Sequence, residues 1–307
     1  MTDISSRLVT VADDIDFGEG PVALPDGRVA FTEVGGQRIS VAEGRTRRPI
    51  AKVPGAPNGM ARGPDGALYV ANNGGIGPDR NHDLWTADDA LDGCIQRVGL
   101  DGEVSDFVAG LPGAHPHRPN DLCFGPGGSL YFTDSGNWEV FFTEETDFRS
   151  SPPGYRHGAL YLRAADGEVV RLADVSDFPN GLAVTPDGEH LVVAQTVLLR
   201  LVSFPLRADG TVGEPELYCQ LPEPVLPDGM CFTEDGTLYV CGAVGDAIAV
   251  IGPDRQLVDV LETGVHSDPT NVCLTEGTLW ITHGTGRRLA TLEVDARPLP
   301  LFGAGRD

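Results

Sequence analysis

The stretch NDLCFGPGGSLYFTD, from Asn120 to Asp134, contains the pattern from which the fold of this chain can be predicted. Two short apolar runs, LCF and SLYF, flank a glycine-rich turn, which is the pattern of a β-hairpin. Three polar side chains, Arg118, Asn120 and Asp121, stand where the hairpin begins. An ordinary strand needs no guanidinium, amide and carboxylate together at its start, so these residues are candidates for a functional site.

Five further stretches repeat the pattern of a polar residue, a short apolar strand, a turn and a second strand. They are EGPVALPDGRVAFTE from Glu19, NGMARGPDGALYVAN from Asn58, NGLAVTPDGEHLVVAQ from Asn180, DGMCFTEDGTLYVCG from Asp228 and TNVCLTEGTLWITHG from Thr270. Repeats of about 40–50 residues with four strands each are typical of β-propeller blades. The sequence therefore predicts an all-β, six-bladed β-propeller with four antiparallel strands per blade, in a single domain over residues 1–307.

The two ends of the chain and the cysteines fit this architecture. RLVTVA near the N-terminus and RRLATLEV near the C-terminus are both strand-like, and an unpaired blade edge would promote aggregation. We therefore expect the N-terminal strand to complete the last blade. The six cysteines show no C-x-x-C pair and no metal-ligand spacing, so we expect reduced thiols that serve packing.

Composition excludes several classes of partner. The net charge of −23 leaves no basic stripe for nucleic acid and disfavours anionic lipid, so we expect neither nucleic acid nor membrane as a partner. The first 20 residues lack a basic and an apolar leader segment, and no run of 18 apolar residues occurs, which predicts a cytoplasmic protein. The oligomeric state is not predicted. The remaining partner class is a small-molecule substrate.

The repeats place polar residues around the propeller axis. All inner strands run in the same direction, so the residues that start them meet at one channel mouth: Glu19, Asn58, Asn120, Asn180, Asp228 and Thr270. Any one of them could satisfy backbone groups near a turn. As a set of carboxylate, amide and hydroxyl oxygens without Cys or His, they favour a hard cation such as Ca²⁺.

A second, wider ring is expected where the second strand of each repeat ends. Its members are Glu33, Asn73, Asp134, Gln195, Cys241 and His283. Residues on the rim of a site can contact a substrate, and we predict this role for Glu33, Asn73 and His283. For His283 a packed or surface position is an equally good interpretation.

Four motifs carry a family likeness. They are GEGPV at Gly18–Val22, RPNDL at Arg118–Leu122, FPNGLAV at Phe178–Val184 and LPDGM at Leu226–Met230. The four motifs occur in the same order as in the SMP-30/gluconolactonase family, which the chain resembles over almost its whole length. The resemblance implies a six-bladed propeller with one divalent cation on its axis, usually Ca²⁺, with Mg²⁺, Mn²⁺ or Zn²⁺ as alternatives.

The resemblance also implies roles for single residues. Glu19, Asn180 and Asp228 match metal ligands, and Asn120 matches a residue that reaches the metal or the substrate. Arg118 and Asp121 match substrate contacts in some members. Asp228 matches the aspartate that activates water, and we predict that it is the catalytic base.

The implied function is opening of a lactone ring by a metal-dependent hydrolase of the carboxylic ester type. Two alternatives stay open: another reaction on the same metal scaffold, such as phosphotriester hydrolysis or a biosynthetic rearrangement, and a non-enzymatic binding propeller. The long loops Gly74–His117 and Ser135–His157 and the departure TDSGNW at Thr133–Trp138 leave open whether the substrate is a sugar lactone or another compound. No other catalytic motif, such as G-x-S-x-G or H-E-x-x-H, is present.

Overall fold

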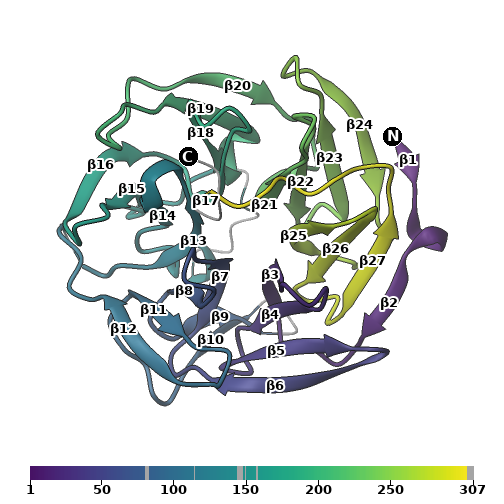
Figure 1. Cartoon of the computed structure of the whole chain (residues 1–307), viewed down its shortest axis with the longest axis horizontal. Helices are drawn as coiled ribbons and strands as arrows, with labels where there is room; N and C mark the ends of the chain where they lie inside the picture. Colours follow the sequence, from purple (N-terminus) through teal and green to yellow (C-terminus); the bar gives the residue numbers. More distant parts are fainter. Residues whose placement is uncertain (80–82, 114, 144–147, 149, 157, 303–307) are drawn as a thin grey trace.

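Each sequence repeat forms the two inner strands of one antiparallel sheet, and six such sheets surround a central axis (Figure 1). The computed structural model describes residues 1–79, 83–113, 115–143, 148, 150–156 and 158–302. The sheets are the blades of a six-bladed β-propeller, so the predicted fold class is confirmed.

The strands next to the axis are the apolar runs that open the repeats. In chain order these inner strands are β3 (Gly18–Ala23), β7 (Pro57–Arg62), β13 (Pro119–Phe124), β17 (Pro179–Val184), β21 (Leu226–Phe232) and β25 (Pro269–Thr275). The second strands, which return after the turn, are β4 (Val29–Glu33), β8 (Leu68–Asn72), β14 (Leu130–Asp134), β18 (His190–Gln195), β22 (Leu238–Ala243) and β26 (Thr278–His283).

The outer strands come from the segments between repeats. The third strands are β5 (Arg38–Glu43), β11 (Cys94–Val98), β15 (Gly158–Arg163), β19 (Arg200–Pro205), β23 (Ala247–Ile251) and β27 (Leu289–Glu293). The fourth strands are β6 (Thr46–Lys52), β12 (Val104–Val108), β16 (Val169–Val175), β20 (Glu216–Gln220), β24 (Leu257–Glu262) and β2 (Val9–Ala12). Because β2 pairs with β27, the sixth blade takes its outermost strand from the opposite end of the chain.

A few short elements are added to the blades. β1 (Thr2–Asp3) extends the fifth blade as a parallel neighbour of β24. β9 (Ile76–Pro78) and β10 (Leu84–Thr86) form a hairpin inside the long loop of the second blade, and α1 (Val140–Thr143) lies in the long loop of the third. The described residues also include the single 3₁₀ turns η1 (Ser5–Arg7), η2 (Pro126–Gly128) and η3 (Thr196–Leu198). Among the residues that the structure describes, no helix is both long and apolar enough to cross a membrane.

The hydrophobic core lies between blades rather than at one centre. Between the first two blades, Ile39 and Val41 pack with Met60, Leu68 and Val70, and all of them are buried. A similar cluster separates every other pair of neighbouring blades, including the sixth and the first. Apolar contact on both faces of each sheet fixes the blades around the axis and leaves the channel mouth for polar residues.

Candidate metal centre

The inner strands share an irregularity where the sequence predicts the polar ring. The register between first and second strand shifts at this point in all six blades, for example between Glu19 and Val22. A proline directly precedes the ring residue in the five later blades, as Pro119 precedes Asn120. A β-bulge re-aims a side chain, and proline cannot donate to the strand ladder. The bulges therefore release the ring side chains from the regular alternation of the sheet.

Five ring residues meet in one cavity of about 480 Å³ at the channel mouth. They are Glu19, Asn58, Asn120, Asn180 and Asp228. The sixth, Thr270, does not line the cavity, because its hydroxyl donates to the Gly18 carbonyl at 2.7 Å and joins the last blade to the first. The structure thus brings together the four residues proposed as metal ligands and adds Asn58.

The two ring carboxyls lie in an environment that disfavours their charge. Burial, followed by repulsion from Asp121, raises the pKa of Glu19 to about 8. Burial, followed by repulsion from Glu19, Asp121 and Asp268, raises the pKa of Asp228 well above its usual value. Among the described residues that line the cavity there is no arginine, lysine or histidine to compensate. A bound cation would supply the missing positive charge.

The neutral members of the ring also offer free oxygens. The side-chain oxygens Oδ1 of Asn58 and Asn180 are buried and have no hydrogen-bond partner among the described residues. The amide Nδ2 of Asn180 donates to Thr196 Oγ1 at 3.3 Å, which orients the amide. Unpaired buried acceptors are costly unless a ligand satisfies them. Two carboxylates and two orphan amide oxygens fit a hard divalent cation with oxygen ligands.

A second polar layer lies next to the ring in the channel. Glycine follows the ring residue in four blades, but Asp121 and Asn271 occupy this position in the third and sixth. A Cβ on Gly59 would lie 2.1 Å from Asp121 Oδ1, and one on Gly229 would lie 2.0 Å from Asn271 Cγ. The glycines are therefore needed so that the two larger side chains fit between neighbouring inner strands.

Asn271 connects the two polar layers. Its Nδ2 donates to Glu19 Oε2 at 3.1 Å and to Asp121 Oδ2 at 3.2 Å, while its Oδ1 accepts from the Val272 N–H. Burial raises the pKa of Asp121 to about 7. Asp121 does not line the ring cavity but a second cavity at the far end of the channel. Sequence reasoning missed Asn271, which positions Glu19.

The wider ring does not reach the cavity. Glu33 is fully buried and paired with Arg38 and Arg47, at 2.7 and 2.8 Å. The Oδ1 of Asn73 accepts from the N–H groups of Gly75 and Ile76 at 3.4 and 3.3 Å. Asn73 therefore holds the loop that follows its strand, Glu33 holds the outer strands β5 and β6 of its blade, and neither side chain lines the cavity.

His283 and Arg118 are also engaged elsewhere. His283 Nδ1 donates to the Ser267 carbonyl at 2.6 Å, and burial lowers the pKa of His283 to about 3. Arg118 lies 3.6 Å from Glu139 Oε2 and donates to the His117 carbonyl at 3.2 Å. Neither side chain lines the cavity. The structure therefore does not bring together the predicted substrate contacts Arg118, Asp121, Asn73, Glu33 and His283.

Aromatic residues line the cavity in their place. One wall, here called the aromatic wall, comes from the loop around α1 and from the start of the fourth blade: Trp138, Phe141, Phe142, Phe148 and Phe178. Phe17 belongs to the first blade and lines the cavity as well. Phe17 and Phe178 each stand two residues before a ring residue, and this shared spacing was the available sequence signal.

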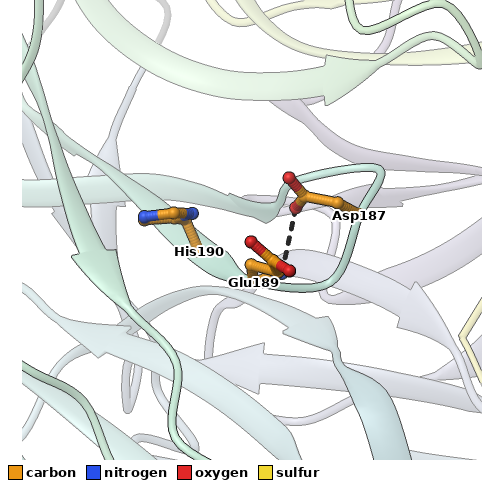
Figure 2. Close-up of side chains that lie close together, drawn as sticks. All are labelled: Asp187, Glu189 and His190. Atoms are coloured by element: carbon orange, nitrogen blue, oxygen red, sulfur yellow. Dashed lines mark hydrogen bonds between the residues drawn. The ribbon is translucent and has the colours of Figure 1, made fainter.

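Another group of potential ligands lies far from this site in the hairpin between β17 and β18. The ligand atoms of Asp187, Glu189 and His190 lie within 4.8 Å of one another, and the first two side chains are exposed (Figure 2). The Asp187 carboxylate already accepts from Thr185 Oγ1 at 2.6 Å and from the Glu189 N–H at 3.0 Å. These hydrogen bonds explain the group as a turn, and it takes no part in the metal centre at the channel mouth.

Comparison with known proteins agrees with the motifs. A model of the SMP-30/Gluconolactonase/LRE-like region matches residues 17–285. Gluconolactonase from Zymomonas mobilis subsp. mobilis is 24% identical over 300 residues, covering 89% of this chain and 77% of that protein. Diisopropyl-fluorophosphatase from Loligo vulgaris is 30% identical over 269 residues, covering 82% of this chain and 80% of that protein.

A solved structure agrees with the fold. Regucalcin from Agrobacterium tumefaciens, described as a calcium-binding protein, matches this chain with a TM-score of 0.70 at 20% identity, over 94% of this chain and 94% of that one. At this level of identity the match shows that the two chains share a fold.

Proposed function

Because this chain belongs to the SMP-30/Gluconolactonase/LRE-like family, we propose that it is a divalent-cation-dependent hydrolase that opens a lactone ring. One relative is a gluconolactonase, although the two chains are only 24% identical. The observation that carries the proposal is the cavity ring, in which Glu19 and Asp228 are buried together without a cationic side chain among the described lining residues.

The cation would be held by residues of the same ring. Glu19, Asn120, Asn180 and Asp228 are the proposed ligands, and the orphan oxygen of Asn58 is placed in the same cavity. All are oxygen donors, which favours Ca²⁺ over the softer metals, and the calcium-binding regucalcin has the same fold. A cation held there supplies Lewis-acid polarisation of a carbonyl oxygen.

Asp228 is the proposed general base. It lines the cavity beside the other ring residues, and the described lining residues offer its carboxylate no cationic partner. It would take a proton from the water that attacks the lactone carbonyl and later return it to the leaving alkoxide. The amide of Asn271 would hold Glu19 in place, since it donates to that carboxylate at 3.1 Å.

The experiment that tests this proposal replaces the base but keeps an oxygen ligand. We expect Asp228→Asn to retain the cation in elemental analysis while lactone turnover falls at least ~10²-fold, the usual scale for losing a general base. Asp187→Asn, the same change on the exposed turn, is the control and should turn over lactone at the normal rate. Near-normal turnover in Asp228→Asn would reject the role of Asp228.

A second candidate is hydrolysis of an organophosphate ester in the same cavity. It is favoured by the diisopropyl-fluorophosphatase relative, which at 30% identity is more similar over its aligned region than the gluconolactonase. Lactone hydrolysis and organophosphate hydrolysis can be distinguished by measuring the turnover of lactones, carboxylic esters and phosphotriesters by the unmodified, calcium-loaded protein. Activity on phosphotriesters without activity on any lactone would favour the second.

A further inference from the structure

The walls of the cavity differ from its floor. The floor is the polar ring, whereas the aromatic wall packs into one cluster above it. Trp138 lies 5.4 Å from Phe142 and 6.1 Å from Phe178 between ring centroids, and Phe141 lies 5.4 Å from Phe178. Trp138, Phe141 and Phe178 are at least nine-tenths buried. Edge-to-face packing of this kind makes a rigid apolar surface.

The cavity is apolar beyond the aromatic wall too. In the fifth blade it is lined by Pro224, Leu226, Ala243 and Val244. Phe17 adds an aromatic ring from the first blade, which lies opposite the fourth blade in a ring of six (Figure 1). A ligand above the polar ring would therefore touch apolar side chains on several sides.

The backbone holds two of these rings in an uncommon conformation. Phe17 and Phe178 have φ angles of +56° and +66°, in the left-handed region that bulky residues rarely adopt. Hydrogen bonds hold the backbone at these positions: the N–H of Val34 donates to the Phe17 carbonyl at 2.9 Å, and the N–H of Phe178 donates to Tyr155 Oη at 3.0 Å. Such conformations cost about 1–3 kcal/mol and cluster at ligand sites.

Polar groups on the walls already have partners, apart from the indole N–H of Trp138, which is buried and has none among the described residues. Thr196 donates its hydroxyl to the Pro227 carbonyl at 2.7 Å. The carboxylate of Asp268 accepts from the N–H of Val244 at 2.9 Å and from the N–H and hydroxyl of Thr285 at 2.8 and 2.9 Å. The other charged wall residue among those described is Asp83, which is exposed. Several substrate hydroxyls entering this cavity would lose water without gaining equivalent partners.

From this arrangement we infer that the substrate is a lactone carrying an alkyl or aryl substituent, and not a polyhydroxylated sugar lactone. The inference rests on the proposed function and deepens it. The ring would receive the ester group, and the aromatic wall with Phe17 would receive the substituent. A site of about 480 Å³ is large enough for a small-molecule ligand of this class.

A chain-length series tests the inference. The calcium-loaded protein is given γ-butyrolactone, γ-hexanolactone, γ-octanolactone and γ-decanolactone, with glucono-1,5-lactone as the hydroxylated comparison. We expect kcat/KM to rise about threefold to fourfold for each methylene added, which corresponds to burying a CH₂ group. A flat series, or a preference for glucono-1,5-lactone over γ-decanolactone, would overturn the inference.

Two variants test whether the preference for longer lactones depends on the aromatic wall. Phe178→Ala should lower the ratio of kcat/KM for γ-decanolactone to that for γ-butyrolactone about tenfold or more, because an apolar surface is lost. Phe107→Ala removes the same ring from the outer strand β12 and should keep the wild-type ratio. Circular dichroism and bound calcium show whether each variant is folded. An unchanged ratio in a folded Phe178→Ala protein would contradict the assignment.

Failure of the proposed function can be told apart from failure of this inference. If no lactone is hydrolysed, the proposed reaction is wrong, and calorimetric titration still measures binding to the unmodified protein. Tighter binding of γ-decanolactone than of γ-butyrolactone, weakened in Phe178→Ala, would support the apolar site without any turnover. Equal affinity for the two lactones would reject it.

Discussion

At the scale of single residues, the buried carboxylates of this protein are of two kinds. Burial alone would raise the pKa of Glu33, but hydrogen bonds from Arg38, Ser40 and Arg47 outweigh it and lower the pKa to about 2. Burial dominates for Glu19, whose pKa rises to about 8. A carboxylate with its partners in place stabilises the fold, whereas one without a cationic partner is available to bind a cation.

The paired carboxylate gives a stability prediction. Glu33→Gln should lower the free energy of unfolding at pH 7 by about 2–3 kcal/mol, since two partly exposed arginines lose a buried partner. Glu43→Gln, which changes the two exposed ion pairs of Glu43 with Arg28 and Arg48, is the matched control and should unfold close to wild type. Urea unfolding of the three proteins measures the difference.

The same residue gives a pH dependence. The folded pKa of Glu33 is lowered from 4.5 to about 2, so the folded state binds fewer protons than the unfolded state in this window. Its stabilisation is therefore complete above pH 4.5 and is lost as the pH falls toward 2. The gap between wild type and Glu33→Gln should shrink over this range. A gap that stays constant from pH 7 to pH 3 would contradict the lowered pKa.

Alignment of the repeats predicted the ring residues but could not predict the contacts of the residues next to them. Glu19, Asn58, Asn120, Asn180 and Asp228 hold equivalent places in their blades and reach one cavity. Arg118 lies in the same motif as Asn120, yet it forms an ion pair with Glu139 in a long loop that no repeat pattern describes. Long-range contacts of this kind come from tertiary packing.

Among the secondary-structure elements, the inner strands form the site, because the bulge in each of them changes the direction of the ring side chain. Alternation alone would place every second side chain of β17 on the same face of the sheet. The register shift between Pro179 and Leu182 interrupts this alternation, and Asn180 lines the cavity. The proline was visible in the sequence, but a bulge is a property of two paired strands and appears only when both are in place.

Strand β2 gives the prediction at this scale. A variant without residues 1–12 lacks the outer strand of the sixth blade and loses the buried Ile4 and Ala12. We expect its Tm to fall by about 10 °C or more, since several kcal/mol of packing and pairing are lost. A variant without residues 1–3 removes only the exposed strand β1 and serves as the control. A wild-type melting curve for the longer truncation would show that β2 does not hold the blade closed.

At the scale of the whole molecule, the repeats carried most of the information about the fold. Six copies with equivalent turns predict six blades because each copy supplies a hairpin that needs neighbours to bury both faces. The inserted hairpin β9–β10 and helix α1 fall outside the repeats, so the repeat pattern could not predict them. The aromatic wall comes largely from one of these insertions, which is why the chemistry of the floor was predictable and that of the walls was not.

The ring at the channel mouth is proposed to hold one divalent cation. Its occupancy is measured by elemental analysis of protein that has been stripped with a chelator, reloaded with calcium and freed of excess metal. We expect one equivalent in the wild type and in Glu189→Ala, which alters only the exposed turn of Figure 2, and none in Glu19→Ala or Asp228→Ala. A full equivalent in folded Glu19→Ala and Asp228→Ala would contradict it.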